Sequence, residues 1–302
     1  MTESFARPHP ALTPAQRVSL DVNGYVVIPN TLTSDEVGEL MEGIHDLKRE
    51  LQAAAPGASI RSAKLLGNSP LHVTVSPPIE AIPAVAAYCA HPRLVAMAEE
   101  LIGGEARICE TAAIVNRRDP DTYRDPPTYG FHTGVDIPFG SHIKDGLYHC
   151  CFVKTLTNLT DLGPDDGGTV VIAGSHKMDV PLDQLIAAAK EDPRLIHHFV
   201  APAGSTLLLS ETLIHGTGQI RSERERTILI CGYNARLMPR WDFSPWSQDF
   251  LDRIPEAYRT LFNGKQNWTR GPRYRTLDQP ADTREYPRYD WKSLMEAAAV
   301  NV

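Results

Sequence analysis

Two histidines and one arginine in the second half of the chain have the residue types of a metal site that adjoins an anion site. His132 lies in the segment 130–134 (Gly-Phe-His-Thr-Gly), and His215 lies in the segment 210–218 (Ser-Glu-Thr-Leu-Ile-His-Gly-Thr-Gly). Arg226 follows and opens an apolar stretch. Neutral imidazoles on a rigid scaffold suit a redox-active iron that keeps open positions, and an arginine fork grips a carboxylate through two hydrogen bonds. These residues predict a mononuclear iron centre beside the site of a carboxylate-bearing co-substrate.

The segments around these residues have the composition of strands, whereas the preceding segments have the periodicity of helices. A capping box at 33–36 begins an amphipathic helix that extends to about Gln52, and a second helix extends from Pro92 to about Ile102. Runs rich in β-branched residues then predict strands at 106–115, 147–156, 169–172, 204–209 and 227–233. Helices followed by closely spaced strands predict a mostly β chain with flanking helices and a double-sheet or jelly-roll core.

The chain reads as a single domain over residues 1–302, without internal repeats or a linker. We expect a loose arm at 1–17, a helical support at 18–105, the jelly-roll core at 106–236 and a tail at 237–302 that covers the core.

Composition narrows the class of partner. The net charge is −7, whereas nucleic-acid-binding domains are usually basic, so we expect a small-molecule substrate and no nucleic acid polymer. Five cysteines without a C-x-x-C pair argue against a disulfide framework or a structural zinc. No apolar run of about 18 residues occurs, and the N-terminus lacks an apolar targeting segment. These features predict a cytoplasmic protein without a membrane partner, and they leave the oligomeric state open.

Several motifs in the same order resemble the phytanoyl-CoA dioxygenase family of Fe(II)- and 2-oxoglutarate-dependent oxygenases. They lie at 23–29 (Asn-Gly-Tyr-Val-Val-Ile-Pro), at 88–104, at 157–177 and at 215–218, and the likeness covers roughly residues 18–236. The resemblance implies a double-stranded β-helix fold and a reaction that uses Fe(II), 2-oxoglutarate and O2.

The resemblance also implies roles for individual residues. His132 corresponds to the proximal iron ligand and His215 to the distal one. Arg226 and Thr217 are then implied as contacts of the distal carboxylate of 2-oxoglutarate, and Thr133 as a further contact of the co-substrate. Asn116 is a candidate contact of either the co-substrate or the substrate.

Gly134 departs from the hydroxylases of the family, which carry an aspartate or glutamate two residues after the proximal histidine. Side chains at i and i+2 of a strand share a face, so a carboxylate at 134 would reach the metal that His132 binds. Glycine cannot coordinate, and we expect it to leave a hole of about one ligand. The pattern resembles the halogenases of this class, in which a small residue makes room for chloride. It implies radical chlorination of an unactivated aliphatic C–H bond, with chloride as a further cofactor.

Three alternatives remain open at this point. Asp136 could fold back and coordinate if Gly134 opens a turn, or water could fill the gap; either arrangement describes a hydroxylase. A barrel that only holds a ligand is the non-enzymatic alternative.

Charged residues outside the motifs allow two further interpretations. Arg226 could instead pair with Glu223 or Asp165 as a structural ion pair. Arginines of a long loop and of the tail could bind an anionic, nucleotide-like substrate, or they could be plain surface: Arg117, Arg118, Arg124, Arg236 and Arg240.

Overall fold

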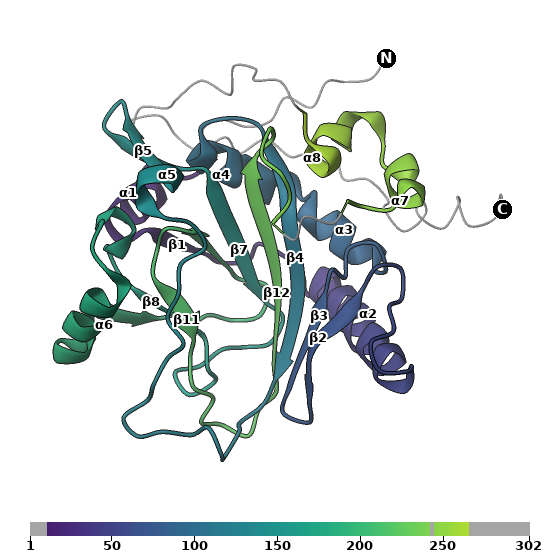
Figure 1. Cartoon of the computed structure of the whole chain (residues 1–302), viewed down its shortest axis with the longest axis horizontal. Coiled ribbons are helices and arrows are strands. Elements are labelled where there is room, and N and C mark those ends of the chain that lie inside the picture. The colour runs from purple at the N-terminus through teal and green to yellow at the C-terminus, as the bar shows by residue number, and fades with distance from the viewer. Residues whose placement is uncertain (1–10, 242–244, 266–302) are drawn as a thin grey trace.

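The computed structural model describes residues 11–241 and 245–265 and shows a mostly antiparallel β fold with flanking helices (Figure 1). The large sheet has the order β1-β10-β7-β12-β4-β3-β2. Its strands are β1 (Tyr25–Ile28), β2 (Lys64–Ser69), β3 (His72–Ser76), β4 (Ala106–Asn116), β7 (Phe152–Asn158), β10 (Thr206–Ser210) and β12 (Arg226–Ala235). The mostly β fold class with flanking helices is thereby confirmed.

A smaller sheet completes the core. It has the order β11-β8-β9, with strands β11 (His215–Thr217), β8 (Thr169–Ile172) and β9 (Ile196–His198). Apolar side chains from β7, β8, β10 and β12 form one buried cluster, so the two sheets pack against each other as in a jelly roll. A separate hairpin joins β5 (Ser141–Lys144) to β6 (Leu147–Cys150).

Helices cover the outer side of the large sheet. The longer ones there are α1 (Pro14–Asn23), α2 (Ser34–Ala53), α3 (Pro83–Cys89) and α4 (Pro92–Ile102), whereas α6 (Leu182–Glu191) packs against β8 of the smaller sheet. Helix α2 begins at the predicted capping box, which Thr33 forms with Glu36. Helix α4 ends near Ile102 as predicted, because Gly103 adopts a left-handed conformation (φ 75°). The apolar faces of α1 to α4 join the main buried cluster, and α6 contributes to a separate small cluster around Ile172 and Ile214. The short helices are α5 (Ile137–Gly140), α7 (Gln248–Arg253) and α8 (Arg259–Asn263), with 3-10 turns η1 (Ser175–Lys177), η2 (Pro193–Leu195) and η3 (Glu256–Tyr258).

The expected loose arm at 1–17 is wrong for its last part. Helix α1 begins at Pro14, since Thr13 and Gln16 form a reciprocal capping box. The buried Glu100 carboxylate accepts hydrogen bonds from the amides of residues 11 and 12, and Arg17 is fully buried beside Asp21 and Glu100. A buried charge is retained only with partners, so this segment is part of the fold. Residues 1–10 lie outside the described residues.

The described part of the tail packs on the core as expected. Trp246, Phe250 and Phe262 are buried in the main cluster, and the Trp246 indole donates to the Phe262 carbonyl over 2.8 Å. Pro255 divides this segment into α7, η3 and α8 because proline cannot continue the hydrogen-bond ladder. Residues 266–302 lie outside the described residues. None of the described helices is long and apolar enough to cross a bilayer.

Candidate functional site

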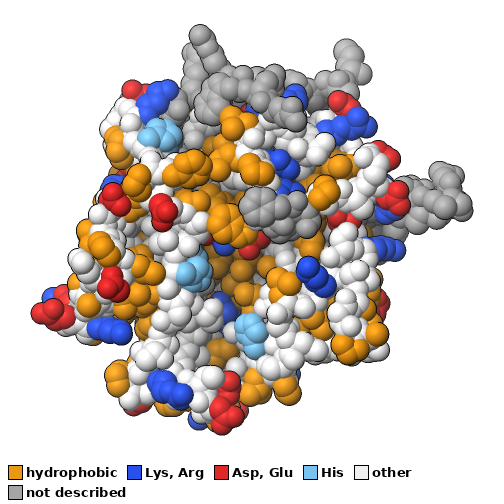
Figure 2. All heavy atoms as spheres, viewed as in Figure 1, with side chains coloured by type: hydrophobic (Ala, Val, Ile, Leu, Met, Phe, Trp, Pro, Cys, Tyr) orange, Lys and Arg blue, Asp and Glu red, His pale blue; other side chains and the backbone are white. Residues whose placement is uncertain are grey.

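The structure brings His132 and His215 together on neighbouring segments. Their backbones exchange two hydrogen bonds, His132 N to His215 O (2.9 Å) and His215 N to His132 O (3.0 Å). The ring centroids are 4.4 Å apart. His215 is buried, whereas His132 is exposed to solvent. Figure 2 shows that this face of the molecule is hollowed near its centre, with histidine side chains beside the hollow. The pair therefore offers two imidazoles to one ion from the open side of the barrel.

Backbone carbonyls orient both rings. Nδ1 of His132 lies 3.0 Å from the Gly130 carbonyl, and Nδ1 of His215 lies 2.8 Å from the Leu213 carbonyl. A carbonyl only accepts, so Nδ1 carries the proton in each neutral ring and Nε2 keeps its lone pair. Burial lowers the pKa of His215, although the nearby Glu211 acts in the opposite direction. A neutral ring with a free Nε2 is the form that binds a metal.

Gly134 is in contact with the carboxylate of Glu211. A Cβ at position 134 would lie 1.9 Å from Glu211 Oε2 and 2.9 Å from Glu211 Cδ, so no larger residue fits beside it without displacement. The Gly134 amide also donates to the Glu211 carbonyl over 2.8 Å. The expected hole at 134 is thus wrong, because the chain fills that space with a side chain from the segment between β10 and β11.

Glu211 belongs to a buried charged cluster. Lys154 Nζ lies 3.4 Å from Glu211 Oε2 and 3.1 Å from Glu110 Oε2. Burial lowers the pKa of Lys154, but the two carboxylates outweigh it and raise that pKa, so Lys154 is charged. Glu211 Oε1 lies 3.8 Å from His215 Nε2. Two carboxylates with one ammonium carry a net negative charge, which favours a cation beside the imidazoles.

Arg226 is buried at the end of β12, opposite Asn116 on β4. Its Nη1 lies 3.5 Å from Asn116 Oδ1, and its Nε has no hydrogen-bond partner among the described residues. Burial lowers its pKa to about 10. The alternative ion pair with Glu223 is not formed, since Glu223 pairs with Arg118 over 2.6 Å. A buried guanidinium with little compensation favours an incoming anion.

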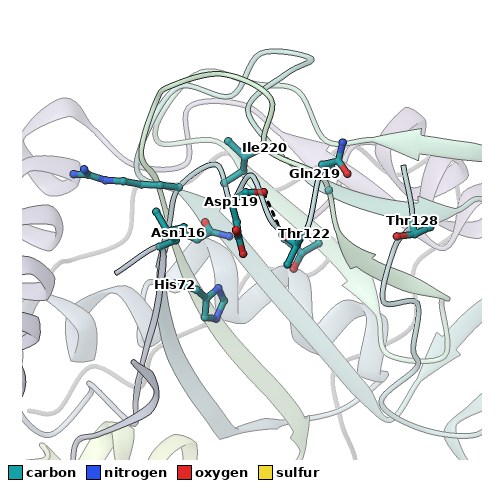
Figure 3. A pocket seen from close by; sticks show the side chains of 11 residues that line it. His72, Asn116, Asp119, Thr122, Thr128, Gln219 and Ile220 are labelled. Atoms are coloured by element: carbon teal, nitrogen blue, oxygen red, sulfur yellow. Dashed lines mark hydrogen bonds between the residues drawn. The ribbon is translucent and has the colours of Figure 1, made fainter. Parts of the chain in front are cut away.

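A cavity of ≈ 400 Å³ lies between β3, β4 and the loop after β11. Its wall includes Asn116 and Thr217, both predicted contacts of the co-substrate. His132, His215 and Arg226 are not among its lining residues, although Thr217 follows His215 by two residues on β11 and Asn116 pairs with Arg226 across the sheet. His72, which the sequence did not single out, also lines it; Figure 3 shows His72, Asn116 and Asp119 close together at one end. The volume suits a small molecule.

Two predicted residues lie elsewhere. Thr133 and Asp136 line a second groove of ≈ 440 Å³ beside α5 and α6, together with Pro138 and Leu185. Asp136 is exposed at the N-cap of α5, so it does not fold back towards the histidines. Thr133 points to the opposite face from His132 because adjacent residues of an extended chain alternate.

The arginines that were candidates for an anionic substrate are mostly engaged. Arg117 pairs with Glu225 over 2.9 Å, and Arg118 pairs with Glu223. Arg236 pairs with Glu105, and Arg240 lies over the Trp246 ring. Arg124 bonds to neighbouring backbone carbonyls. These contacts favour structural roles, and of the five only Arg117 lines the ≈ 400 Å³ cavity.

The polar groups of the site fit a metal with 2-oxoglutarate. Within the described residues no three His, Cys, Asp or Glu side chains converge into a closed metal cluster. The two imidazoles form an open site instead. Glu211 lies nearby, and its buried carboxylate oxygens have the Lys154 ion pair but no hydrogen-bond partner among the described residues. The two neutral imidazoles suit a metal cation, and the buried Arg226, which has no carboxylate partner among the described residues, suits the carboxylate of 2-oxoglutarate.

Known proteins resemble this chain in sequence and in fold. The peroxisomal phytanoyl-CoA dioxygenase of Rattus norvegicus is 23% identical over 239 residues, which cover 73% of this chain and 68% of that protein. HygX from Streptomyces hygroscopicus, with nickel and 2-oxoglutarate bound, has a TM-score of 0.61 at 23% identity, covering 77% of this chain and 90% of that chain. EctD from S. alaskensis, with 2-oxoglutarate and 5-hydroxyectoine, has a TM-score of 0.57 at 22% identity, covering 75% and 77%.

These structural likenesses are consistent with a double-stranded β-helix core. The family model for phytanoyl-CoA dioxygenase (PhyH) matches residues 20–228, well over half of the chain. The chain therefore belongs to the phytanoyl-CoA dioxygenase family and is an Fe(II)/2-oxoglutarate-dependent oxygenase.

Proposed function

We propose that the enzyme oxygenates an unactivated C–H bond of a small-molecule substrate without incorporating halide. The observation that carries this proposal is the Glu211 carboxylate beside Gly134. In the halogenase hypothesis chloride takes the space that a small residue leaves. Here a buried carboxylate stands in that space, so chloride would have to displace it or lie against a like charge.

The residues of the chain divide the work between holding and orienting. His132 and His215 hold iron through Nε2, and the carbonyls of Gly130 and Leu213 fix the rings. Arg226 holds the distal carboxylate of 2-oxoglutarate, and Asn116 orients the guanidinium. When bound, iron with 2-oxoglutarate and O2 supplies the oxidant for the C–H bond. Lys154 keeps the Glu211 side chain in place through their ion pair.

The substrate class is a small molecule. The ≈ 400 Å³ cavity, with polar side chains such as Asp119 and Gln219, supports this class. HygX, which resembles this chain in fold, has been solved with the small molecule hygromycin B bound. The engaged arginines give little support to a nucleotide-like substrate.

Halogenation is the second candidate. One observation favours it, namely that position 134 holds glycine where the hydroxylases carry a carboxylate. This candidate requires Glu211 to leave the space beside Gly134 when chloride binds.

The proposal is tested by following conversion of 2-oxoglutarate to succinate in chloride-free buffer and again with added chloride. We expect the same rate in both, and loss of the rate in the His132→Ala variant. A rate that requires chloride would refute oxygenation without halide. A chain that forms no succinate with iron, O2 and a broad set of small molecules would instead be a binding barrel.

A further inference from the structure

We propose that Trp241 and Glu110 form a subsite for a protonated amino group, so that the small-molecule substrate of the enzyme is an amine. This inference rests on the proposed oxygenase function and names the class of its substrate. Glu110 lies on β4, and Trp241 lies in the segment after β12. Both reach the surface, since Trp241 is 48% exposed and the Glu110 side chain is 22% exposed.

Local contacts bring the indole ring and the carboxylate into one subsite. The Trp241 amide donates to the Cys109 carbonyl over 3.1 Å, which fixes the tryptophan beside the residue that precedes Glu110. The Trp241 ring packs on Phe152, with the ring centroids 5.2 Å apart. Gly232 provides the space beneath them. A Cβ there would lie 2.9 Å from Phe152 Cε2 and 3.2 Å from Glu110 Cβ, so the two side chains meet above it.

Successive contacts connect this subsite with the histidine pair. Lys154 Nζ lies 5.5 Å from the centroid of the Phe152 ring and 3.1 Å from Glu110 Oε2. It also lies 3.4 Å from Glu211 Oε2, and Glu211 Oε1 lies 3.8 Å from His215 Nε2. An amino group held in the subsite would therefore bring an aliphatic carbon of the same molecule towards the proposed iron site.

The subsite is separate from the proposed site of the co-substrate. In the pairing of β4 with β12, Glu110 lies opposite Gly232, whereas Asn116 lies opposite Arg226. At about 3.3 Å per residue, the two pairs are about 20 Å apart along the strands. The amine and the distal carboxylate of 2-oxoglutarate thus have different places on the same sheet.

The charges of the subsite favour a cation. Glu110 and Glu211 share one ammonium group, that of Lys154, so one negative charge is in excess. When bound, the two negative charges of 2-oxoglutarate balance those of Fe(II), so the metal does not cancel this excess. Over residues 11–241 and 245–265, Lys154 is the only partner of the Glu110 side chain. The face of an indole ring also attracts an ammonium group.

A purely structural role is the main alternative. A single exposed aromatic side chain is normal on a surface, and Lys154 already gives Glu110 one partner. That role does not require the indole, the partly exposed carboxylate and the contacts that lead to His215 to occur together. An anionic substrate is disfavoured because it would face two carboxylates, and a neutral one would gain neither electrostatic attraction.

The test is the binding of three probes that share one ring and differ in charge: cyclohexylamine, cyclohexanol and cyclohexanecarboxylate. Calorimetry uses the full-length protein loaded with Ni(II) and 2-oxoglutarate. The amine is protonated at neutral pH. We expect it to bind at least about tenfold more tightly than the alcohol, and the carboxylate to bind most weakly. Equal affinities, a preference for the carboxylate, or no detectable binding of the amine would overturn the inference.

Variants assign the preference to the two side chains. Trp241→Ala should weaken binding of the amine about 2- to 30-fold, whereas Trp241→Phe should keep most of the affinity because a ring face remains. Glu110→Gln should weaken it about 10- to 150-fold and leave the alcohol within about twofold, a loss of charge preference that a structural role would not produce. Binding of 2-oxoglutarate shows that each variant is folded. Amine affinity within about twofold of native in both Trp241→Ala and Glu110→Gln would overturn the inference.

Two exposed side chains elsewhere provide matched controls. Leu195→Ala removes an apolar side chain of similar exposure (39%) beside the smaller sheet. Glu223→Gln removes a carboxylate that is 85% exposed in the segment before Arg226, at the opposite end of β12. We expect both variants to bind cyclohexylamine within about twofold of the native protein. A loss in these controls as large as in the subsite variants would show that the amine binds elsewhere.

The outcomes separate this inference from the proposed function. No preference for the amine, together with chloride-independent succinate formation, would remove the amine subsite but leave oxygenation intact. A clear preference together with chloride-dependent turnover would do the reverse.

Discussion

The Gly134→Ala variant tests whether the Glu211 side chain fills the space beside residue 134 or whether that space is empty. The added methyl group would lie 1.9 Å from Glu211 Oε2, and ordinary van der Waals contact begins at 3.4 Å, so the carboxylate must retreat by about 1.5 Å. That movement alters its contacts with Lys154 and His215. Overpacking of this kind costs about 1–3 kcal/mol. Since each kcal/mol lowers the Tm of a chain of this size by about 2 °C, we expect a fall of about 2–6 °C.

Thermal unfolding followed by circular dichroism in a chelating buffer measures this cost without a metal contribution. Gly130→Ala is the matched control, because a Cβ there would meet nothing within 4 Å. Combining Gly134→Ala with Glu211→Ala should make the two effects less than additive by about 0.5–3 kcal/mol, as expected for groups in contact. A Tm unchanged by Gly134→Ala would refute the reasoning, since a site with room for a halide tolerates alanine at that position.

Three other expectations follow from the same geometry. Arg226→Gln should weaken 2-oxoglutarate binding about 10- to 150-fold, as expected for the loss of hydrogen bonds to a charged group; calorimetry with Ni(II)-loaded protein measures it, and unchanged affinity would move the co-substrate elsewhere. His215→Ala should abolish high-affinity Co(II) binding while the protein stays folded, and native affinity would exclude His215 as a ligand. Burial lowers the pKa of both His149 and His176 to about 4, so the unfolded chain binds more protons than the folded one between about pH 4 and pH 6.5. Stability should therefore fall as the pH drops through that window, by up to about 3 kcal/mol for each ring; urea unfolding at pH 7 and pH 4.5 checks this, and a His149→Gln variant with the full native dependence would contradict it.

The sequence predicted the parts of the site that reside in local motifs. His132, His215 and Arg226 each lie in a short segment whose residue types state a chemical role, and the structure places the two histidines in contact. Asn116 and Thr217, which were predicted as ligand contacts, both line one cavity, and their role there stays a prediction. The capped helix after Thr33 and the helix that ends at Gly103 were predictable because capping chemistry is local.

The sequence could not reveal the contact between Gly134 and Glu211. It joins two segments far apart in the chain, and its meaning depends on a distance of 1.9 Å that only the packed sheets define. A signal was present, since Glu211 is a charged residue in the otherwise apolar or uncharged segment before His215. Such a residue is buried only with a partner or a metal. Lys154 gave a similar signal, since it is a charged residue within the otherwise apolar or uncharged strand β7. The position of His72 beside Asn116 could not be predicted, because it depends on the register between β3 and β4.

The most direct test of whether Glu211 excludes chloride from the space beside Gly134 uses the anaerobic protein with Fe(II) and 2-oxoglutarate. The visible charge-transfer band of that complex is followed while chloride is added, with sulfate at matched ionic strength as the control. We predict a band that does not respond to chloride in the native enzyme, because Glu211 occupies the space beside Gly134, and a saturable response in Glu211→Ala. A saturable chloride-dependent shift in the native enzyme would contradict the account and support halogenation.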